Sequence, residues 1–541
     1  MTTHHFVIET KDYSRAELDF NSDKRCIRKA LRSFLMQQDR LNRVDKFIKE
    51  KQDGVPLLIY PHSLDDSKDL KKNKGSSILF VDYDSNKKAF SLQTFGLMGY
   101  ISVTFTEDED ESEGSANPAD EYHFDIFIHS RFDWHEPPII RYCDNQDIKK
   151  NKNASSVCKD YFLHYMLQHA LNLNIIDCNP SAKESDSELE LMLYFFPGML
   201  RRAMNQGLYK RYVHREYNDD KVRGPIDVAR HIRSNMPFRG NIAYSATEFD
   251  YDNPVTQLVR HTIEYIRHHE WASPLLSQSE QTAQDVQIIV QNTERYEPGN
   301  LHSVLSQNIH PLSHPYFTEW LPLQFLCLSI LMHNDMDYAE ANDEDSIHGI
   351  LFDGPWLWEN YLDVLYTSHN LGFKHPDNNE GKGAIQLFTE GNRERFPDFY
   401  KPAKNPSLTQ PNQYAEEIWD AKFKLRYGNG CEIERDDLNQ VISYMYIQSH
   451  LSGDMSNTAA ICQRGGFVFP IDTESKQDEC LKKIGTLEGI GGTLYKWGLK
   501  IPDSKAYTDY ILFCNEMRNN EEAFLKSYNR DKAQSQTQIR G

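Results

Sequence analysis

The hydrophobic pattern changes its period twice along this chain, and these changes limit the folds that it can adopt. Within residues 77–128, short runs of β-branched and aromatic residues are separated by glycines, which predicts strands. From about 189 to 333, apolar residues recur at three- and four-residue steps, which predicts helices. Beyond 345, helical and strand-like runs alternate, as they do in α/β domains. We therefore predict a multidomain α+β and α/β protein.

The predicted domains follow these changes of period. They are a β-rich N-terminal domain over 1–180, a mainly helical middle region over 181–340, and a C-terminal α/β domain over 341–541. The polar run 179–187 (NPSAKESDS) and the acidic run 342–345 mark the two boundaries. A length of 541 residues favours roughly three to four domains, in line with this division.

Composition excludes several classes of protein. The net charge is −20, so bulk attraction to nucleic acid is not expected, although local contact with DNA remains compatible. No apolar run approaches the ~20 residues of a membrane span, and the first residues lack a signal-peptide layout. The nine cysteines include no CxxC pair, which indicates reduced thiols in a cytoplasmic protein, and a structural zinc site is accordingly not expected.

Two carboxylates and a lysine in the last domain carry the strongest chemical signal. Asp398 opens a possible strand, and Asp420 and Lys422 lie about twenty residues later in a second strand-like run. Side chains alternate along a strand, so Asp420 and Lys422 are expected on one face. Pairing of the two strands would bring Asp398 beside them. An Asp-x-Lys triplet alone also suits a solvated strand face, and the signal becomes specific only with its neighbours.

Those neighbours extend the set in order along the chain. Glu359 lies on a predicted helix ahead of Asp398, and Gln440 and Tyr444 lie four residues apart on a helix that follows Lys422. Mg²⁺ is held by one or two carboxylates while it keeps waters and binds phosphate oxygens. It lowers the pKa of a bound water and stabilises charge on phosphate. The set therefore predicts metal-assisted cleavage of phosphodiester bonds.

This ordered set resembles that of the PD-(D/E)xK nucleases, and the chain as a whole resembles McrC, the nuclease subunit of McrBC-type restriction systems. The resemblance is carried by ILFDGPWLWENYLDVLY (350–366), RFPDFY (395–400), IWDAKFKLRY (418–427) and RDDLNQVISYM (435–445). Upstream it includes the segment 206–232 around Arg223-Gly224 and the helices at 243–266 and 315–331. It covers about 190–470, with looser matches at FGLMGYISV (95–103) and IHSRFD (128–133).

The resemblance implies a restriction-endonuclease-like C-terminal domain and a role for each residue of the set. Glu359 takes the place of the helix glutamate, Asp398 that of the motif aspartate, and Asp420 and Lys422 form the acid-x-Lys pair. Gln440 matches the downstream glutamine, and it completes the expected catalytic set. The metal ligands would be Asp398 and Asp420, with Mg²⁺ as the cofactor.

The resemblance further implies a DNA endonuclease subunit of a defence complex. Its partners would be a hexameric AAA+ GTPase ring of the McrB type and double-stranded DNA, and the N-terminal β-rich domain would dock into the ring and stimulate its hydrolysis. The alternative is a non-catalytic activator of an AAA+ NTPase with a degenerate nuclease fold. The intact Glu359, Asp398, Asp420 and Lys422 argue against that alternative.

Three further features have more ordinary interpretations. The histidine pairs at 268–269 and 310–314 are predicted to be structural, and the glycine-rich run 489–493 lacks the layout of a phosphate-binding loop. The segment 201–233 is dense in arginine and tyrosine. It suits contact with a partner, contact with DNA, or ordinary surface, and the sequence leaves these three open.

Overall fold

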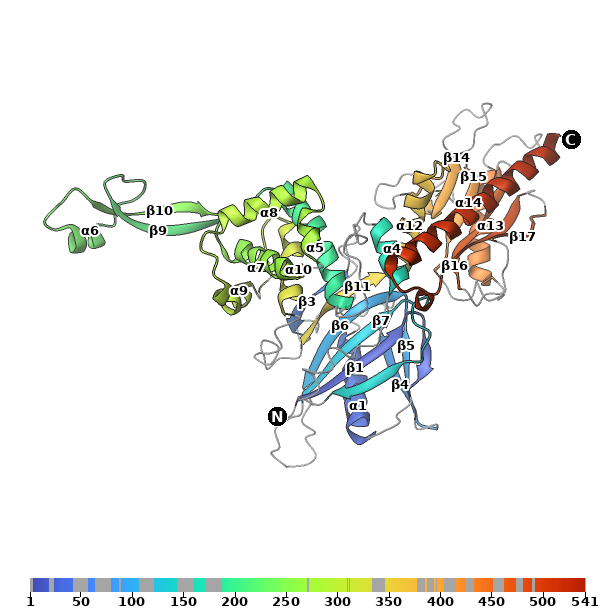
Figure 1. Ribbon diagram of the computed structural model, residues 1–541, viewed down its shortest axis with the longest axis horizontal. Helices are drawn as coiled ribbons and strands as arrows, with labels where there is room; N and C mark the ends of the chain where they lie inside the picture. Colours follow the sequence, from blue (N-terminus) through green and yellow to red (C-terminus); the bar gives the residue numbers. More distant parts are fainter. Residues whose placement is uncertain are drawn as a thin grey trace. The chain divides into compact units, whose positions relative to one another are not determined.

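The structure is a computed structural model, and Figure 1 shows its ribbon. It describes residues 3–18, 24–41, 57–63, 79–86, 89–106, 121–143, 160–170, 187–269, 272–308, 310, 312–332, 346–376, 385–386, 394–395, 397–402, 415–423, 433–450, 462–472, 480–488 and 492–540. The chain divides into two compact units, Met1–Ser187 with Glu344–Gly541, and Glu188–Asp343. The second junction falls at the acidic run that marks a predicted boundary. The division into three domains stays a prediction.

The N-terminal part of the first unit is built on a six-stranded sheet. Its strand order is β3-β11-β6-β7-β1-β8, and β1 and β7 are parallel neighbours whereas the other pairs are antiparallel. The strands are β1 (Thr3–Lys11), β3 (Leu57–Ser63), β6 (Leu97–Thr106), β7 (Glu121–His129), β8 (Ile139–Cys143) and β11 (Ser346–Asp353). Strand β11 therefore belongs to the same sheet as β1, although more than 300 residues separate the two strands in the sequence.

A smaller sheet and one helix complete this part. Strands β2 (Arg15–Glu17), β5 (Ala89–Thr94) and β4 (Leu79–Asp84) form the sheet in that order, and the helix is α1 (Lys24–Leu41). Both sheets and the helix contribute to one apolar core, in which Phe34 of α1 lies edge-on to Phe124 of β7. Residues alternate along β7 between this core and the opposite face, which is the pattern expected of a strand with one buried face. The strands predicted from the sequence here are confirmed.

The C-terminal part of the first unit is built on a five-stranded sheet of order β14-β15-β16-β18-β17. Its three central strands are parallel, and its two edge strands are antiparallel to their neighbours. The strands are β14 (Phe399–Pro402), β15 (Ala415–Ala421), β16 (Arg464–Ile471), β17 (Leu481–Thr486) and β18 (Thr493–Lys500). A separate two-stranded pair consists of β12 (Ile385–Gln386) and β13 (Glu394–Arg395). The alternation of helix and strand predicted for this region is confirmed.

Four helices cover or flank the C-terminal sheet. They are α4 (Tyr161–Ala170), α12 (Gly354–Ser368), α13 (Arg435–His450) and α14 (Tyr510–Arg540). The indole of Trp497 on β18 stacks on Phe524 of α14 with ring centroids 4.0 Å apart. Glu521 of α14 is buried and accepts hydrogen bonds from the hydroxyls of Tyr165 and Tyr361, at 2.8 and 2.6 Å. One carboxylate thus ties α4, α12 and α14 together.

The segment IHSRFD at 128–133 joins the two sheets of the first unit. Arg131 forms a buried ion pair with Asp12, and its guanidinium lies 4.3 Å from the ring centroid of Phe423. Asp133 accepts hydrogen bonds from the backbone of Phe162 and so caps the start of α4. These contacts give the polar residues Arg131 and Asp133 of this segment a structural role.

The second unit is a bundle of helices. Its helices are α5 (Ser187–Asn205), α6 (Val228–Asn235), α7 (Pro254–His268), α8 (Glu280–Asn292), α9 (Leu301–Asn308) and α10 (Trp320–Met332), with short 3₁₀ turns at Ser273–Ser277 and Pro298–Asn300. Helix α7 begins at Pro254 because Asn253 caps it reciprocally with Thr256 and proline suits the first helical position. Helix α10 is apolar on all sides and is correspondingly buried.

The mainly helical character predicted for 181–340 is wrong for one segment. Strands β9 (Arg211–Asp219) and β10 (Ile242–Asp250) form an antiparallel hairpin that carries α6 between them, and in Figure 1 it extends away from the helices of its unit. We call residues 211–250 the arm. Gly224 is required in it, because a Cβ there would lie 2.1 Å from the carbonyl oxygen of Ser245. Polar and charged residues make up most of β9, so it lacks the apolar two-residue period that predicts a strand.

Among the described residues, no helix is both long and apolar enough to cross a membrane.

Candidate active site

Strand pairing brings the two predicted metal-binding aspartates together. In the antiparallel pair of β14 and β15, Phe399 lies opposite Trp419, so Asp398, just ahead of β14, lies beside the end of β15. The backbone N–H of Ala421 donates a hydrogen bond of 2.7 Å to Oδ2 of Asp398. Asp420 occupies the position before Ala421 and is fully buried. The predicted juxtaposition of Asp398 and Asp420 is therefore present.

Lys422 belongs to the same cluster, although it does not lie in the strand as predicted. Strand β15 ends at Ala421, and the backbone N–H of Lys422 donates to the carbonyl oxygen of Val468 at 2.8 Å. Nζ of Lys422 lies 2.5 Å from Oδ2 of Asp420 and 3.7 Å from Oδ1 of Asp437. Burial opposes the charge on Lys422, but the adjacent Asp420 raises the pKa of its ammonium overall, so this group is a cation at neutral pH.

Helix α12 brings Glu359 to the same place. The carboxylate of Asp353 caps the helix by accepting from the backbone N–H of Trp356. Trp358 and Tyr361 are buried and fix the helix against its neighbours, which leaves Glu359 partly exposed between them. Burial, followed by the negative charges of Asp353 and Asp420, raises the pKa of Glu359 to about 7. The predicted helix glutamate is thus in electrostatic contact with the aspartates.

The pKa values of the two aspartates show how strongly negative charge is concentrated here. Burial, and then the charge of Glu359, raises the pKa of Asp398 to about 7. Burial, and then the charge of Asp398, raises the pKa of Asp420 to about 8. Lys422 works in the opposite direction on each of the three acids but does not balance them. Without a further cation, the site holds protons at neutral pH.

The donor set fits a hard divalent cation. Both carboxylate oxygens of Asp420 are buried without a hydrogen bond of acceptable geometry, even though Lys422 lies close to one of them. A buried charged oxygen is ordinarily satisfied by hydrogen bonds or by a metal. Mg²⁺ is typically bound through one or two carboxylates and keeps several waters. Asp398 and Asp420 are the oxygen ligands that such an ion requires.

Gln440 has a hydrogen-bond partner within its own helix. It lies on α13, and its amide donates to the hydroxyl of Tyr444 at 3.1 Å within the same helix. Within the part of the chain that the structure describes, Gln440 forms no hydrogen bond to the three acids or to Lys422. Tyr444 is itself buried and packs in the core of the C-terminal sheet.

Two acids of the site were missed from the sequence. Asp437, in the first turn of α13, approaches Lys422, and Asp353 adds to the negative potential at Glu359. Asp353 could have been identified as a helix cap, because it precedes Gly354-Pro355 at the start of a helical pattern. Nothing in the sequence marked Asp437 as a site residue, because acidic residues are common in the first turn of a helix.

The histidines and cysteines outside this site have structural surroundings. Nδ1 of His268 and Nδ1 of His269 lie within hydrogen-bonding distance of carbonyl oxygens one turn earlier in α7, and His314 accepts from the backbone N–H of Tyr316. Cys327, Cys462, Cys480 and Cys514 are free thiols. These observations agree with the structural role predicted for the histidines and with the reduced state predicted for the thiols.

Comparison with known proteins places the chain in a family. A family model described as "McrBC 5-methylcytosine restriction system component" matches residues 139–455, which is more than half of the chain. None of the curated proteins compared with the chain matches it.

Comparison with solved structures finds two from Thermococcus gammatolerans. One is a refined half-complex from a tetradecameric assembly of McrB AAA+ hexamers with bound McrC, with 11% identity, 97% of this chain and 99% of that chain covered, and a TM-score of 0.48. The other is a cryo-EM structure of the McrBC complex, with 12% identity, 69% and 89% covered, and a TM-score of 0.29. On the strength of the match over residues 139–455, which confirms the family expected from the sequence, the chain belongs to the McrBC 5-methylcytosine restriction system components.

Proposed function

We propose that the protein is a DNA endonuclease subunit that hydrolyses phosphodiester bonds with Mg²⁺. The observation that carries the proposal is the convergence of Asp398, Asp420, Glu359 and Lys422 at one end of β14 and β15. Membership of a restriction-system family supports DNA as the substrate. The five-stranded sheet with its flanking helices is compatible with a PD-(D/E)xK nuclease domain.

Each residue has a distinct role in this proposal. Asp398 and Asp420 would hold Mg²⁺, which supplies a polarised water and stabilises charge on the phosphate when it is bound. Lys422 carries a positive charge beside the ligands, so it can orient the attacking water and offset charge that develops on phosphate oxygens. Glu359 has a pKa near neutrality, which suits a group that exchanges a proton with water at this site.

Substitution of the ligands tests the catalytic part of the proposal. Asp420→Asn and Lys422→Ala are expected to lower DNA cleavage by about 10²-fold or more, because each removes stabilisation of the transition state. The measurement is cleavage of methylated and unmethylated plasmid DNA by the full chain with its partner, nucleotide and Mg²⁺. Asp436→Asn is the matched control, since Asp436 is an exposed acid next to Asp437.

Three outcomes would contradict the proposed catalytic function or its metal mechanism. Cleavage by Asp420→Asn at the level of the unmodified protein would show that the site lies elsewhere. Unchanged cleavage in EDTA would exclude a metal mechanism. An unmodified protein that stimulates its partner but never cuts DNA would establish the alternative function, a non-catalytic activator.

We further propose that the partner is an AAA+ GTPase ring of the McrB type, which presents double-stranded DNA to this site. Family membership supports the proposal, and the Thermococcus gammatolerans assembly is described as McrB AAA+ hexamers with bound McrC. The net charge of −20 also favours delivery of DNA by a partner over direct capture from solution. The sequence favours the N-terminal β-rich domain as the docking surface.

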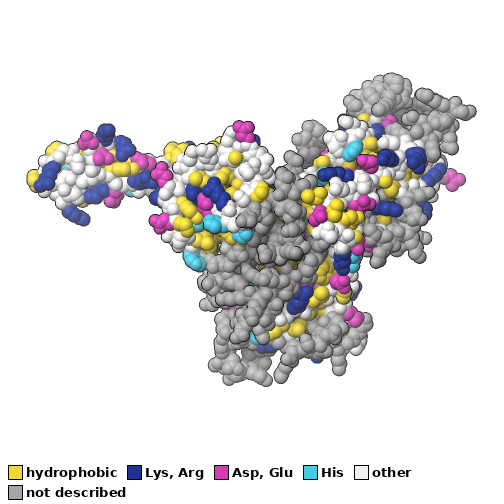
Figure 2. Space-filling model, viewed as in Figure 1, with side chains coloured by type: hydrophobic (Ala, Val, Ile, Leu, Met, Phe, Trp, Pro, Cys, Tyr) yellow, Lys and Arg dark blue, Asp and Glu magenta, His cyan; other side chains and the backbone are white. Residues whose placement is uncertain are grey.

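The arm is a second candidate for docking, and one observation favours it. Its large apolar side chains are exposed, including Tyr212 at 70%, Met236 at 66%, Val228 at 62%, Phe238 at 59% and Ile232 at 57%. Figure 2 shows apolar and basic side chains interspersed over this part of the chain. Exposed apolar patches on a folded protein commonly mark an interaction site.

Three of the six arginines of the arm hold it together through ion pairs. Arg215 pairs with Asp250, Arg223 with Glu248, and Arg230 with Glu216, at 3.2, 3.4 and 2.9 Å. Because their charges are matched across the hairpin, they are poorly suited to neutralise DNA phosphates. Of the three interpretations left open for this segment, contact with a protein partner is therefore the one that we propose.

A further inference from the structure

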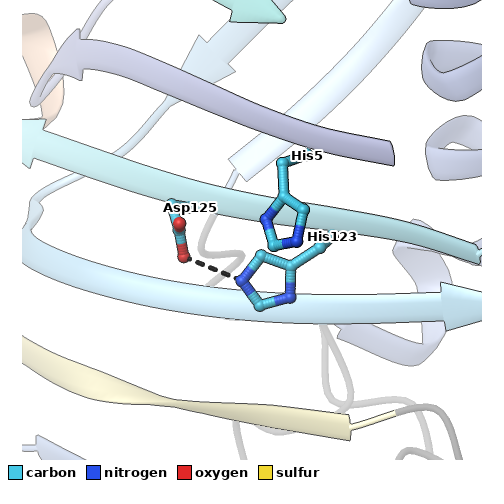
Figure 3. A group of neighbouring side chains, drawn as sticks. All are labelled: His5, His123 and Asp125. Carbon is cyan, nitrogen blue, oxygen red and sulfur yellow. Dashed lines mark hydrogen bonds and ion pairs between the residues drawn. The ribbon is translucent and has the colours of Figure 1, made fainter. Parts of the chain in front are cut away.

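Three side chains with metal-binding atoms meet on the N-terminal sheet, on the face opposite its apolar core (Figure 3). His5 lies on β1, and His123 and Asp125 lie on the adjacent parallel strand β7. His5 and His123 are direct register partners, with ring centroids 4.6 Å apart. One ligand atom from each of the three residues lies within 4.8 Å of the other two.

The neighbours of this cluster orient its side chains. Nδ1 of His123 is 3.0 Å from the hydroxyl of Thr104, whereas Nε2 lies 3.1 Å from the hydroxyl of Ser102 and 3.2 Å from Oδ1 of Asp125. The hydroxyl of Tyr100 donates to the same Oδ1 at 2.7 Å. Histidine ligands of metals are usually held through their other ring nitrogen, which fixes the ring. Thr104 is placed to do this, and Nε2 of His123 is then directed towards Asp125.

We propose that His5, His123 and Asp125 bind one divalent transition-metal ion, for which Zn²⁺ fits the ligands well. Two imidazoles and one carboxylate suit such an ion, whereas Mg²⁺ and Ca²⁺ prefer oxygen ligands throughout. Bonds to Zn²⁺ are about 2.0–2.1 Å long, so the side chains need only small rotations to converge. Three protein ligands leave a fourth position for water.

This site is separate from the proposed catalytic one and was not expected from the cysteine pattern. Its ligands come from two strands that lie far apart in the sequence, so they form no metal-binding sequence motif of fixed spacing. The ion would join β1 to β7, the only parallel pair among the described strands of the six-stranded sheet. It would therefore stabilise the sheet that holds the start of the described chain.

Metal titration of the full chain, without an affinity tag and stripped of metal, tests the proposal. All proteins would carry Asp420→Asn, so that the catalytic carboxylates do not compete for the probe. Zn²⁺ binding is measured by calorimetry, and Co²⁺ is used as a spectroscopic probe of nitrogen coordination. The variants are His5→Ala and Asp125→Asn, with His5→Gln as a second variant should either fail to fold. His4→Ala is the matched control, because His4 lies on the same strand and stacks on Tyr122 of the opposite face.

The parent is expected to bind one equivalent of Zn²⁺ and to gain thermal stability from it. Binding should weaken at least tenfold in His5→Ala and Asp125→Asn and remain unchanged in His4→Ala. Zn²⁺ binding in the His5 and Asp125 variants equal to that of the parent would overturn the proposal. A parent that binds no Zn²⁺, or binds Co²⁺ without nitrogen coordination, would overturn it as well.

Discussion

Asp420 combines full burial with two carboxylate oxygens that receive no well-formed hydrogen bond. Its neighbour Asp398 adds a negative charge, and together with burial this raises the pKa of Asp420 to about 8. An ionised carboxylate in such surroundings destabilises the folded chain unless a cation is present. Burial of this carboxylate therefore costs the folded chain stability, and the Mg²⁺ that we propose would offset that cost.

This cost predicts the effect of pH and of substitution on the metal-free protein. A carboxyl group whose pKa is about 4 when unfolded and about 8 when folded binds its proton more tightly in the folded state. Its contribution to the free energy of unfolding is therefore largest below pH 4 and is lost as the pH rises towards 8. Asp420→Asn removes the ionisation, so in EDTA at pH 8 it is expected to raise the melting temperature by about 2–4 °C.

Thermal denaturation followed by circular dichroism at pH 5 and pH 8 provides the measurement. The difference between Asp420→Asn and the unmodified protein should be larger at pH 8 than at pH 5. Addition of Mg²⁺ at pH 8 should stabilise the unmodified protein and have less effect on the variant. A variant less stable than the unmodified protein at pH 8 in EDTA would contradict this account of Asp420.

The sequence predicted those site residues whose position depends on local pattern. Asp398, Asp420 and Lys422 follow from strand pairing at a fixed spacing, and Glu359 follows from its place on a helix. Asp437 was missed because only the packing of α13 against β15 brings it towards Lys422. Gln440 was also expected in the site. It donates a hydrogen bond to Tyr444, and its role in the site stays a prediction.

At the scale of secondary structure, the sequence predicted the helices and strands whose apolar residues recur with a clear period, but it did not predict the arm. Helices α7 and α12 carry capping residues and apolar stripes, and the sequence predicts a helix in both regions. The arm buries few of its side chains, among them Ala243, Tyr244 and Ala246, so its strands show little apolar alternation. It is held by ion pairs and by aromatic contacts such as the stacking of Tyr217 on Tyr244, which a hydrophobic pattern cannot reveal.

The contact between α4, α12 and α14 makes a prediction about stability and catalysis together. Glu521→Ala would leave the buried hydroxyls of Tyr165 and Tyr361 without an acceptor. Each unsatisfied buried group costs about 1–3 kcal/mol, so a loss of about 2–5 kcal/mol in the free energy of unfolding is expected. Cleavage should fall as well, because α12 carries Glu359.

Chemical denaturation and plasmid cleavage measure the two effects. Glu522→Ala is the control, since Glu522 is the exposed neighbour of Glu521 and pairs only with Lys526 among the described residues. If Glu521→Ala and Glu522→Ala were equally stable, the buried carboxylate would not be holding the three helices together.

At the scale of the whole molecule, the N-terminal residues support the C-terminal part of the first unit. Helix α4 lies within 1–180, yet it packs on α12 through Phe162 and Trp358 and on α14 through Tyr161 and Phe513. Strand β11, which leads into α12, pairs with β3 and β6. Deletion of 1–180 is therefore expected to destabilise the C-terminal part, so point substitutions are the better test of docking.

Substitutions on the arm test whether it docks to the motor. Val228→Ser with Ile232→Ser removes two exposed apolar side chains of α6, so the fold should be unaffected while stimulation of the partner's GTP hydrolysis falls by at least tenfold. Ile288→Ser, an exposed apolar position on α8 of the same unit, is the control. If the double variant stimulated the partner's GTP hydrolysis fully, the arm would not be the docking surface, and the N-terminal domain would be the remaining candidate.

The place of β11 in the N-terminal sheet has a consequence for synthesis on the ribosome. Strand β3 ends at Ser63, but its described partner β11 begins only at Ser346, and β11 also separates β3 from β6. At about 5–20 residues per second, the nascent chain waits roughly 15–60 s between making the two strands. During that interval the edge of β6 that β11 will cover remains available to other strands, and exposed edges invite aggregation. The newly made protein therefore depends on protection of this edge, by chaperones or by the remainder of its own chain, until residue 353 has left the ribosome.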